Sequence, residues 1–506
     1  MRRIVSFLTL ALALPSLARG QLSIGGCDSR CSLGDAEYAG VVLDLVCTDL
    51  PYGSDPCQVL DAYIVESSAP SPVLIELHGG GFHGGAKGVF STYLDEDQSG
   101  DGVVERALQH GFSVVSVGYR LTAVVDACCT EHFDAQGNSP DLSHAFPAAN
   151  DDVARAIQFV RHMAQTGAWN VDPARIAAIG GSAGATLASW VAMAADRADP
   201  NAPPTSPEAQ SSRPTVVVSL SGPTQFTADF FYTCAYPHSE DAVWYFGALT
   251  PQQFNTDPGL TPVRQQASPA WLAALDGAPS AGFTLNRRVA WLGLYDGDPS
   301  WTLNDFIDPG LNCTFQPQAL WKPTPNAHSI VFGLQMRSVL ESIGSSKVDL
   351  LVKPPGACAQ WNSFGSDYVI DFIAKHLQFV PHVDLSSIYP GKQSGSGLTP
   401  KLSAYGELTA DGSATIWLRD APPAKRAWLY SSPNQNPTPY QGGTLVPDQA
   451  SLSILYLGQT DDCGHLSLTL PGGAGPASFY SQVVIEDRGA SFSTGLTNAI
   501  RLDFTP

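Results

Sequence analysis

The middle of the chain alternates short apolar runs with longer stretches in which apolar residues recur at helical spacing. The runs have the length of buried strands, and the longer stretches have that of covering helices. Strands are predicted at residues 73–77, 113–117, 175–179, 216–220, 289–294 and 348–352, and helices at 103–109, 146–163, 185–195 and 368–377. Strands that alternate with helices predict an α/β domain with a mostly parallel sheet covered by helices. Two earlier segments, 41–46 and 62–65, are expected to be antiparallel edge strands.

Two long segments interrupt this alternation. Residues 223–265, rich in aromatic residues and proline, stand where a cap over an active site would be inserted, and residues 299–325 form a second long loop. Loops of this length in a compact domain are commonly lids or walls of binding sites. The cap aromatics would favour an apolar or aromatic group in a ligand, although ordinary packing explains them equally well: Phe230, Phe231, Tyr232, Trp244, Tyr245 and Phe246.

The pattern changes near residue 383. Residues 383–396 contain a Ser-Gly-rich run and are predicted to be a linker. Beyond them, short alternating segments separated by turn residues lie at 414–418, 428–431, 452–457, 466–470, 479–485 and 499–504. This pattern predicts an all-β sandwich at residues 397–506, separate from a first domain at residues 21–382. No catalytic set is recognisable in the sandwich, which favours a stabilising or attachment role.

The first 20 residues have the pattern of a signal peptide. Arg2 and Arg3 precede a mostly apolar stretch, and Ala18 and Gly20 place small residues before a cleavage site at Gln21. The apolar stretch is shorter than the roughly 20 residues that span a bilayer, and no other segment is long enough, so no membrane span is expected. The sequence therefore predicts a secreted protein, extracellular or periplasmic.

Cysteine content and charge narrow the picture further. Ten cysteines in an exported chain indicate disulfides, but nine precede residue 360 and only Cys463 follows it, so the connectivity stays open. With 44% hydrophobic and 15% charged residues the chain is globular, and its net charge is −20. An anionic surface of this size repels phosphate backbones, which excludes nucleic acid as a partner.

The strongest chemical signal is the run GGSAG at residues 180–184, between a predicted strand and a predicted helix. This context is typical of a nucleophile elbow, in which glycines permit a tight turn that holds the serine hydroxyl above the sheet. The start of the following helix favours negative charge at that point. Ser182 is therefore the predicted nucleophile.

A second signal, HGGGF at residues 78–82, follows an earlier predicted strand. The backbone N–H groups of Gly80 and Gly81 could join that of Ala183 around a developing oxyanion. One such donor contributes roughly 3 kcal/mol of transition-state stabilisation. The alternative is a glycine turn of purely structural use, which is disfavoured because both motifs occur in the expected order.

Residues 70–380 resemble the α/β-hydrolase esterases of the hormone-sensitive-lipase and feruloyl-esterase-like groups. The matching pieces are HGGGF at 78–82, GYR at 118–120, DPARIAAIGGSAGA at 172–185 and ASPAW at 267–271. The resemblance implies an α/β-hydrolase fold and esterase- or lipase-like chemistry with a Ser-Asp-His triad in that chain order. No cofactor is expected.

The same resemblance places the triad acid shortly after the strand at 289–294. Asp298 fits best and Asp296 is the reserve, while two turn-forming aspartates are the alternative interpretation. The triad histidine should follow the strand at 348–352, yet residues 354–361 contain none. Without a base, a serine hydroxyl is a poor nucleophile at neutral pH.

His328 is the candidate for a relocated base. It follows Asn326, an expected N-cap, at the start of a predicted helix that would begin on the side where the strands end. A helix N-terminus also favours the neutral imidazole that a base needs. A surface histidine near a cap is the alternative interpretation, and His238 in the cap is a weaker candidate.

Residues 95–101 have the alternating oxygen spacing of a calcium loop, with candidate ligands Asp95, Asp97, Ser99 and Asp101. The twelfth position of such a loop is Arg106 rather than glutamate. A solvated acidic turn is therefore the favoured interpretation, and a structural calcium ion is the alternative.

The leading hypothesis is an exported carboxylic-ester hydrolase that forms an acyl-enzyme at Ser182 and acts on an aromatic or polymer-linked ester. The rival hypothesis is a catalytically impaired hydrolase-like protein used for binding or surface attachment. A serine exopeptidase of the same fold is disfavoured because no propeller or other gating domain precedes the hydrolase region.

Overall fold

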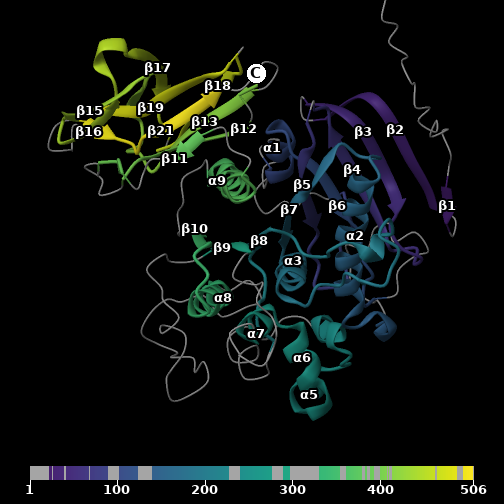
Figure 1. Cartoon of the computed structure of the whole chain (residues 1–506). Coiled ribbons are helices and arrows are strands. Elements are labelled where there is room, and N and C mark those ends of the chain that lie inside the picture. The colour runs from purple at the N-terminus through teal and green to yellow at the C-terminus, as the bar shows by residue number, and fades with distance from the viewer. Residues whose placement is uncertain are drawn as a thin grey trace, which may run out of the picture.

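The computed structural model describes residues 22–24, 27–38, 41–67, 69–88, 102–123, 140–226, 240–275, 289–296, 330–353, 361–378, 382–384, 388–392, 399–406, 408–409, 413–461, 464–473, 475–486 and 494–504. These residues form one large, mostly parallel sheet covered by helices, and a C-terminal group of antiparallel sheets (Figure 1). None of the helices in these ranges is both long and apolar enough to cross a membrane.

The large sheet has the described strand order β1-β2-β3-β4-β6-β5-β7-β8-β9-β10. Its parallel part consists of β5 (Ser71–Leu77), β6 (Ser113–Val117), β7 (Val171–Gly181), β8 (Val216–Leu220), β9 (Ala290–Asp296) and β10 (Val348–Lys353). All of these were predicted from the sequence. They are covered on both faces, which is why they read as apolar runs without alternation.

The antiparallel part consists of β1 (Leu22–Ile24), β2 (Cys27–Tyr38), β3 (Val41–Pro51) and β4 (Val59–Val65). β4 pairs with β6, and β3 lies between β2 and β4. The prediction that residues 41–46 and 62–65 form edge strands is therefore wrong, although both segments are antiparallel strands. The strand β2 was missed because its sequence, CDSRCSLGDAEY, is mostly polar and gives no strand pattern.

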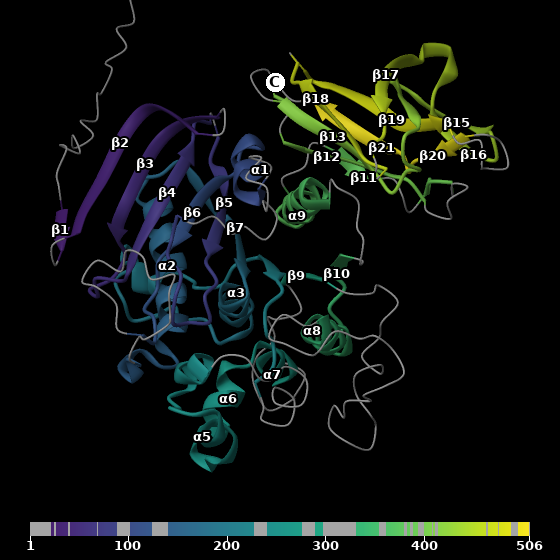
Figure 2. The same ribbon diagram turned by 180° about the vertical axis from the view of Figure 1, so that it is seen from behind.

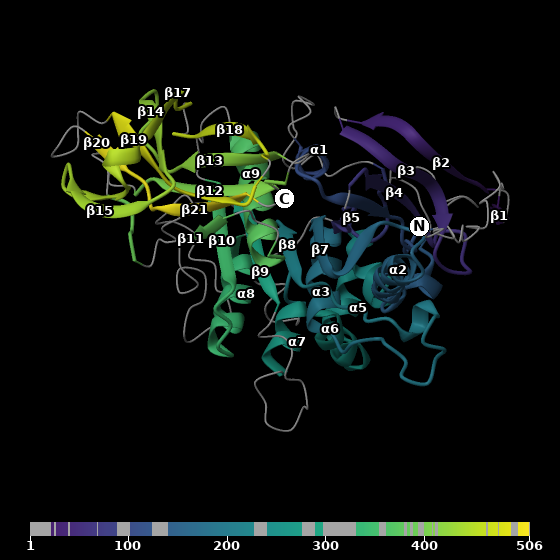
Figure 3. The same cartoon turned by 45° about the horizontal axis from the view of Figure 1, so that its top comes forward.

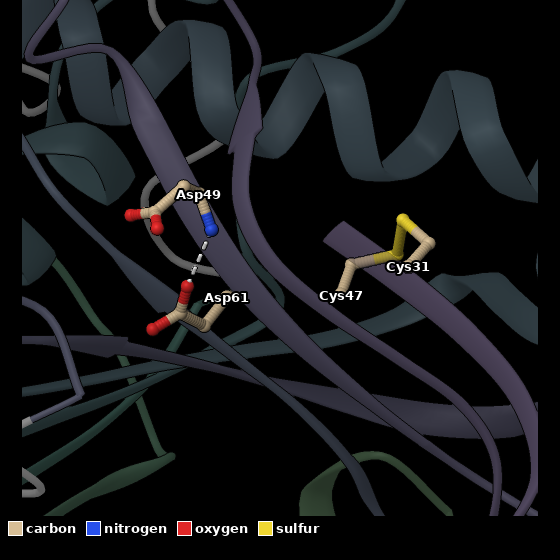
Figure 4. The surroundings of a disulfide bond; sticks show 4 residues. All are labelled: Cys31, Cys47, Asp49 and Asp61. Atoms are coloured by element: carbon tan, nitrogen blue, oxygen red, sulfur yellow. Dashed lines mark hydrogen bonds between the residues drawn. A yellow bond between two sulfur atoms is a disulfide. The ribbon is translucent and has the colours of Figure 1, made fainter. Parts of the chain in front are cut away.

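A disulfide joins Cys31 of β2 to Cys47 of β3, which lie opposite each other across the strand pair (Figure 4). Further along β3, the backbone N–H of Asp49 donates to a carboxylate oxygen of Asp61 at 2.8 Å. The ammonium of Lys87 binds both carboxylates, at 2.7 and 2.8 Å. These contacts fasten the antiparallel strands to the chain that follows β5.

Helices cover the two faces of the large sheet. One face carries α2 (Ala148–Gln165), α3 (Ala183–Met193) and α8 (Ile330–Ser342), and the other carries α1 (Val103–Gln109) and α9 (Trp361–His376) (Figures 1 and 2). The two faces form separate buried clusters. Successive strand residues alternate between them, so that Ile75 points into one cluster and Leu74 into the other.

Within the predicted cap and just after it, the described residues form short helices. These are η4 (Glu240–Phe246), α5 (Pro251–Thr256), η5 (Pro258–Leu260), α6 (Thr261–Ala267) and α7 (Pro269–Leu275). Trp244, Tyr245 and Phe246 are buried. Phe230, Phe231 and Tyr232, together with the second predicted loop at 299–325, lie outside the described residues.

The C-terminal part of the chain forms antiparallel sheets. One has the order β11 (His382–Asp384), β21 (Ile500–Phe504), β19 (Ala477–Glu486), β14 (Arg426–Ser432), β17 (Ser453–Gln459), with β20 (Thr494–Leu496) paired to β19. A second contains β12 (Lys401–Gly406), β13 (Ser413–Arg419) and β18 (Leu466–Pro471), and a hairpin contains β15 (Gln435–Tyr440) and β16 (Gly443–Pro447). Side chains from the first two sheets share one buried cluster. The strand β11 overlaps the start of the segment predicted as a linker, residues 383–396.

This C-terminal part packs against α9 through β12 and β13 (Figure 3). Along β13, Ile416 and Leu418 point into the cluster between the sheets, whereas Trp417 points the other way and joins the buried cluster under α9. The guanidinium of Arg419 lies 4.7 Å from the ring centre of Tyr368 on α9 and 3.4 Å from a carboxylate oxygen of Asp371. The strand β13 therefore contributes to two cores at once.

Candidate active site

Ser182 stands alone between a strand and a helix. The strand β7 ends at Gly181 and α3 begins at Ala183, and Ser182 has φ 52° and ψ −115°. A positive φ is strained for a residue with a side chain, and such strain concentrates at functional sites. Two hydrogen bonds hold the turn: the N–H of Ser182 donates to Leu220 O at 2.9 Å, and its carbonyl accepts from the N–H of Thr186 at 3.1 Å.

The glycines on either side of Ser182 are required by close backbone contacts. A Cβ atom at Gly180 would lie 2.3 Å from the carbonyl carbon of Gly184. A Cβ atom at Gly184 would lie 2.1 Å from the carbonyl oxygen of Leu77, at the end of the neighbouring strand β5. The glycines that the elbow motif calls for therefore let α3 start directly against β5.

The glycine turn after β5 lies against this elbow. A Cβ atom at Gly79 would stand 3.4 Å from the Cβ of Ser182. Gly80 and Gly81 have φ values of 111° and 63°, and the carbonyl of Gly80 accepts from the N–H of Gly84 at 2.9 Å. Among the described residues, the N–H groups of Gly80 and Gly81 donate to no acceptor. Ala183 is the first residue of α3, so its N–H has no acceptor within the helix either.

His78 fixes the start of the glycine turn. Its ring is buried and stacks on Tyr119 with the ring centres 4.2 Å apart, while the Tyr119 hydroxyl donates to the His78 carbonyl at 2.7 Å. The Nδ1–H of His78 donates to the carbonyl of Gly79 at 2.7 Å. Burial lowers the pKa of His78 to about 4, so the ring is neutral at pH 7. These contacts give His78 a positioning role.

An aromatic stack joins the glycine turn to the segment predicted as a cap. Phe82, with φ 67°, stacks on Tyr245 of η4 with the ring centres 3.8 Å apart. The Tyr245 hydroxyl donates to the side-chain oxygen of Asn150 on α2 at 2.7 Å. The described cap aromatics therefore pack around the turn, which agrees with the packing interpretation of Tyr245.

The predicted acid and base positions are only partly described. Asp296 is the last residue of β9 and pairs with Lys353 of β10, while Asp298 lies outside the described residues. His328 and His238 also lie outside them. The helix α8 begins at Ile330, two residues beyond His328.

The turn after β8 also helps to position the elbow, and the sequence did not predict this role. The hydroxyl of Thr186 on α3 donates to Pro223 O at 2.7 Å, and the hydroxyl of Tyr295 on β9 donates to Gly222 O at 2.7 Å. The hydroxyl of Thr224 donates to the carbonyl of Phe332 in the first turn of α8, at 2.8 Å. This turn connects the elbow, β9 and the start of α8. The only sequence signal for it was a Ser-Gly-Pro run directly after a strand.

A cleft of about 700 Å³ lies at the same edge of the sheet, beside β6. Its lining includes an ion pair between Arg120 and the fully buried Asp152, with a closest contact of 2.6 Å, and Gln58 donates to the same carboxylate at 2.7 Å. The hydrogen bonds raise the pKa of Arg120, which stays charged. Arg120 was noted in the sequence only as part of the GYR run, because its partner Asp152 is 32 residues away.

No cluster of three or more potential ligand side chains that could hold a metal occurs in the described part of the chain. Asp95, Asp97, Ser99 and Asp101, the candidate calcium ligands, lie outside that part. The helix that was predicted to follow them is α1.

Comparison with known proteins gives one family match. The BD-FAE family model, which describes an α/β-hydrolase-type esterase domain, matches residues 139–249, a segment that includes Ser182. No curated protein matches this chain.

Solved structures give weaker likenesses. A truncated carbohydrate esterase from gut microbiota is 17% identical over 68% of this chain and 99% of its own, with a TM-score of 0.42. An acetyl ester-xyloside bifunctional hydrolase from Caldicellulosiruptor lactoaceticus is 20% identical over 63% and 86%, with a TM-score of 0.38. A thermophilic esterase from Thermogutta terrifontis is 15% identical over 65% and 91%, with a TM-score of 0.38. Scores this low carry no inference about substrate. The family match over the elbow confirms the resemblance of this chain to the α/β-hydrolase esterases.

Proposed function

We propose that this protein is a secreted serine carboxylic-ester hydrolase that works through an acyl-enzyme at Ser182. One observation carries the proposal: the strained turn at Ser182 lies against a glycine turn whose amides have no acceptor among the described residues. Unused backbone donors beside a nucleophile are what an ester carbonyl needs when it becomes an oxyanion.

In the proposed reaction the Ser182 oxygen adds to the ester carbonyl carbon and gives up its proton to a base. The amides of Gly80, Gly81 and Ala183 stabilise the negative oxygen that results, at roughly 3 kcal/mol for each good donor. The bond to the alcohol oxygen then breaks, and the alcohol leaves with the proton. Water attacks the acyl-enzyme in the same way, which releases the acid and restores the serine.

Asp298 and His328 are the proposed acid and base. Support for His328 comes from α8, which begins two residues later and whose first turn is tied to Thr224 in the turn beside the elbow. The start of a helix favours a neutral imidazole, the form that accepts a proton. Asp298 follows β9, the strand next to β8 in the sheet, and would orient that base.

We further propose that residues 397–506 form a β-sandwich and that residues 1–20 direct export. The shared buried cluster between the two C-terminal sheets supports the first proposal. The proposed substrate is an aromatic or polymer-linked ester. The rival function, a binding protein on a hydrolase fold, is favoured by one observation: residues 354–361 contain no histidine where the family has its base.

Hydrolysis of p-nitrophenyl acetate and butyrate tests the proposal. The wild-type chain is compared with Ser182→Ala, His328→Ala and His162→Ala, the last a control in the last turn of α2. Ser182→Ala and His328→Ala are each expected to lower kcat by at least about 10³-fold, and His162→Ala to leave it unchanged.

Labelling by a fluorophosphonate separates the two candidate functions. A working hydrolase incorporates one label per chain, at Ser182, and the label is absent in Ser182→Ala. A folded wild-type chain that neither takes the label nor exceeds the Ser182→Ala rate would be a binding protein.

A further inference from the structure

One face of the C-terminal sheet that contains β14 carries aromatic side chains that are exposed or only partly covered. Ala427 and Leu429 of β14 point into the buried cluster between the two sheets, so Trp428 and Tyr430 point outward. On the edge strand β17, Tyr456 lies opposite Trp428 and Ile454 lies opposite Tyr430. Tyr456 is 52% exposed and Ile454 is 55% exposed. We call Arg426, Trp428, Tyr430, Ile454 and Tyr456 the aromatic strip.

Beside the strip, a hairpin covers part of the same face. The hairpin of β15 and β16 packs over β19, where Leu445 is buried with Val484 and Leu496. Tyr440 at the end of β15 lies 6.3 Å from Tyr430, ring centre to ring centre. The hairpin therefore walls the strip on one side, and β17 is the sheet edge on the other.

With the adjacent Glu486 counted, the strip carries no net charge. Its single cation, Arg426, donates from Nε to Glu486 at 2.7 Å, and its guanidinium lies 5.7 Å from the ring centre of Trp428. A neutral ligand has no charged group that would have to give up its hydrating water on binding there. An acidic polymer, in contrast, would be repelled by a chain with net charge −20.

The rings of the strip also suit a ligand with flat apolar faces and polar edges. Trp428 and Tyr456 lie with ring centres 5.7 Å apart at an interplanar angle of 48°, which gives two tilted aromatic faces. Tyr and Trp combine a large apolar surface with a polar group at one end. A sugar ring presents C–H groups on its faces and hydroxyl groups around its rim. We propose that the aromatic strip binds an uncharged polysaccharide, independently of Ser182.

Depletion of the full-length chain from solution by insoluble xylan and by microcrystalline cellulose tests this proposal. Trp428→Ala and Tyr456→Ala are each expected to weaken binding about tenfold, the loss of one stacking partner. Tyr456→Phe, which keeps the ring, should retain most of the binding. Ile388→Ala is the matched control because Ile388 is a 66% exposed apolar residue outside the strip.

Three results would overturn the proposal. The first is a wild-type chain that stays in solution with both polysaccharides, and the second is a set of variants that bind as tightly as the wild type. The third is a dimer, seen by sedimentation velocity, that Tyr456→Ala dissociates, because the strip would then be a self-association surface. Hydrolysis of p-nitrophenyl acetate should be the same in all these variants, so a failure here is distinct from a failure at Ser182.

Discussion

Replacing Trp417 with alanine tests whether the C-terminal sheets share a core with the domain that contains the large sheet. Trp417 lies on β13 but is 1% exposed within the buried cluster under α9. Its ring centre is 6.4 Å from that of Tyr368 on α9 and 5.1 Å from the guanidinium of Arg419. The substitution therefore removes the largest buried side chain at the contact with α9 and one of the two rings on Arg419.

The size of the effect follows from these contacts. A fully buried tryptophan removes roughly 200–250 Å² from water, which at about 25 cal/mol per Å² gives about 5 kcal/mol as an upper value. Substitutions of buried Trp by Ala typically cost about 3–5 kcal/mol. The Arg419 guanidinium keeps its contact with the ring of Tyr368 but loses its contact with the ring of Trp417, which costs about a further 1 kcal/mol. We expect a total loss of about 5 kcal/mol in the free energy of unfolding.

Urea unfolding followed by far-ultraviolet circular dichroism measures this loss, with Trp428→Ala as the matched control. Trp428 lies on the outer, partly exposed face of β14, so its loss should cost about 1 kcal/mol or less. In Trp417→Ala the single transition should also broaden or split, because the two parts of the chain no longer unfold together. A loss for Trp417→Ala no larger than that for Trp428→Ala would refute the shared core.

Three further predictions concern the domain that contains the large sheet. Gly184→Ala should lower esterase activity by about 10²-fold, because the new Cβ would lie 2.1 Å from the carbonyl oxygen of Leu77 and would displace the elbow. The kcat for p-nitrophenyl acetate measures this effect, and near-normal activity would contradict the prediction. The pKa of His78 is about 4 when folded and about 6.5 when unfolded, so the unfolded chain binds the extra proton, and stability should fall by about 3 kcal/mol as the pH drops from 6.5 to 4. As the pH falls through this range, the urea midpoint should decrease less steeply in His78→Asn than in the wild type. Equal pH dependence in the two proteins would argue against a buried neutral ring. Arg120→Ala should cost about 3–5 kcal/mol of stability, because the carboxylate of Asp152 stays buried without its cation; a thermal shift of a degree or less would show that the pair is dispensable.

The sequence was informative wherever one local pattern determined one local structure. Buried strands such as β6 appear as unbroken apolar runs, and the predicted bounds 113–117 and 103–109 are those of β6 and α1. The glycine spacing around Ser182 predicted the elbow, because steric contact with β5 leaves room for no other residue at position 184. At this position the motif predicts the fold because the backbone atoms of the elbow and of β5 lie within a few ångströms of each other.

The sequence was uninformative where a structure depends on residues far apart in the chain. The polar strand β2 is held by pairing to β3 and by the disulfide between Cys31 and Cys47, not by an apolar pattern of its own. The pair of Arg120 with Asp152 spans two elements, and the anchoring of α8 by Thr224 spans 108 residues. For the triad, the motif predicted the tight turn at Ser182, while the catalytic roles of Ser182, Asp298 and His328 remain predictions.

The two-sided strand β13 bears on how this chain can be divided. A linker-like run of serine and glycine invites a cut near residue 396, yet Trp417 beyond that point fills the core beneath α9. A shortened protein that ends there would expose an apolar surface on α9, whose first residue, Trp361, is the last residue of the stretch without a triad histidine. The C-terminal sheets therefore cannot be removed without exposing part of a core. Replacing them with a different domain would require new side chains on the outer surface of α9.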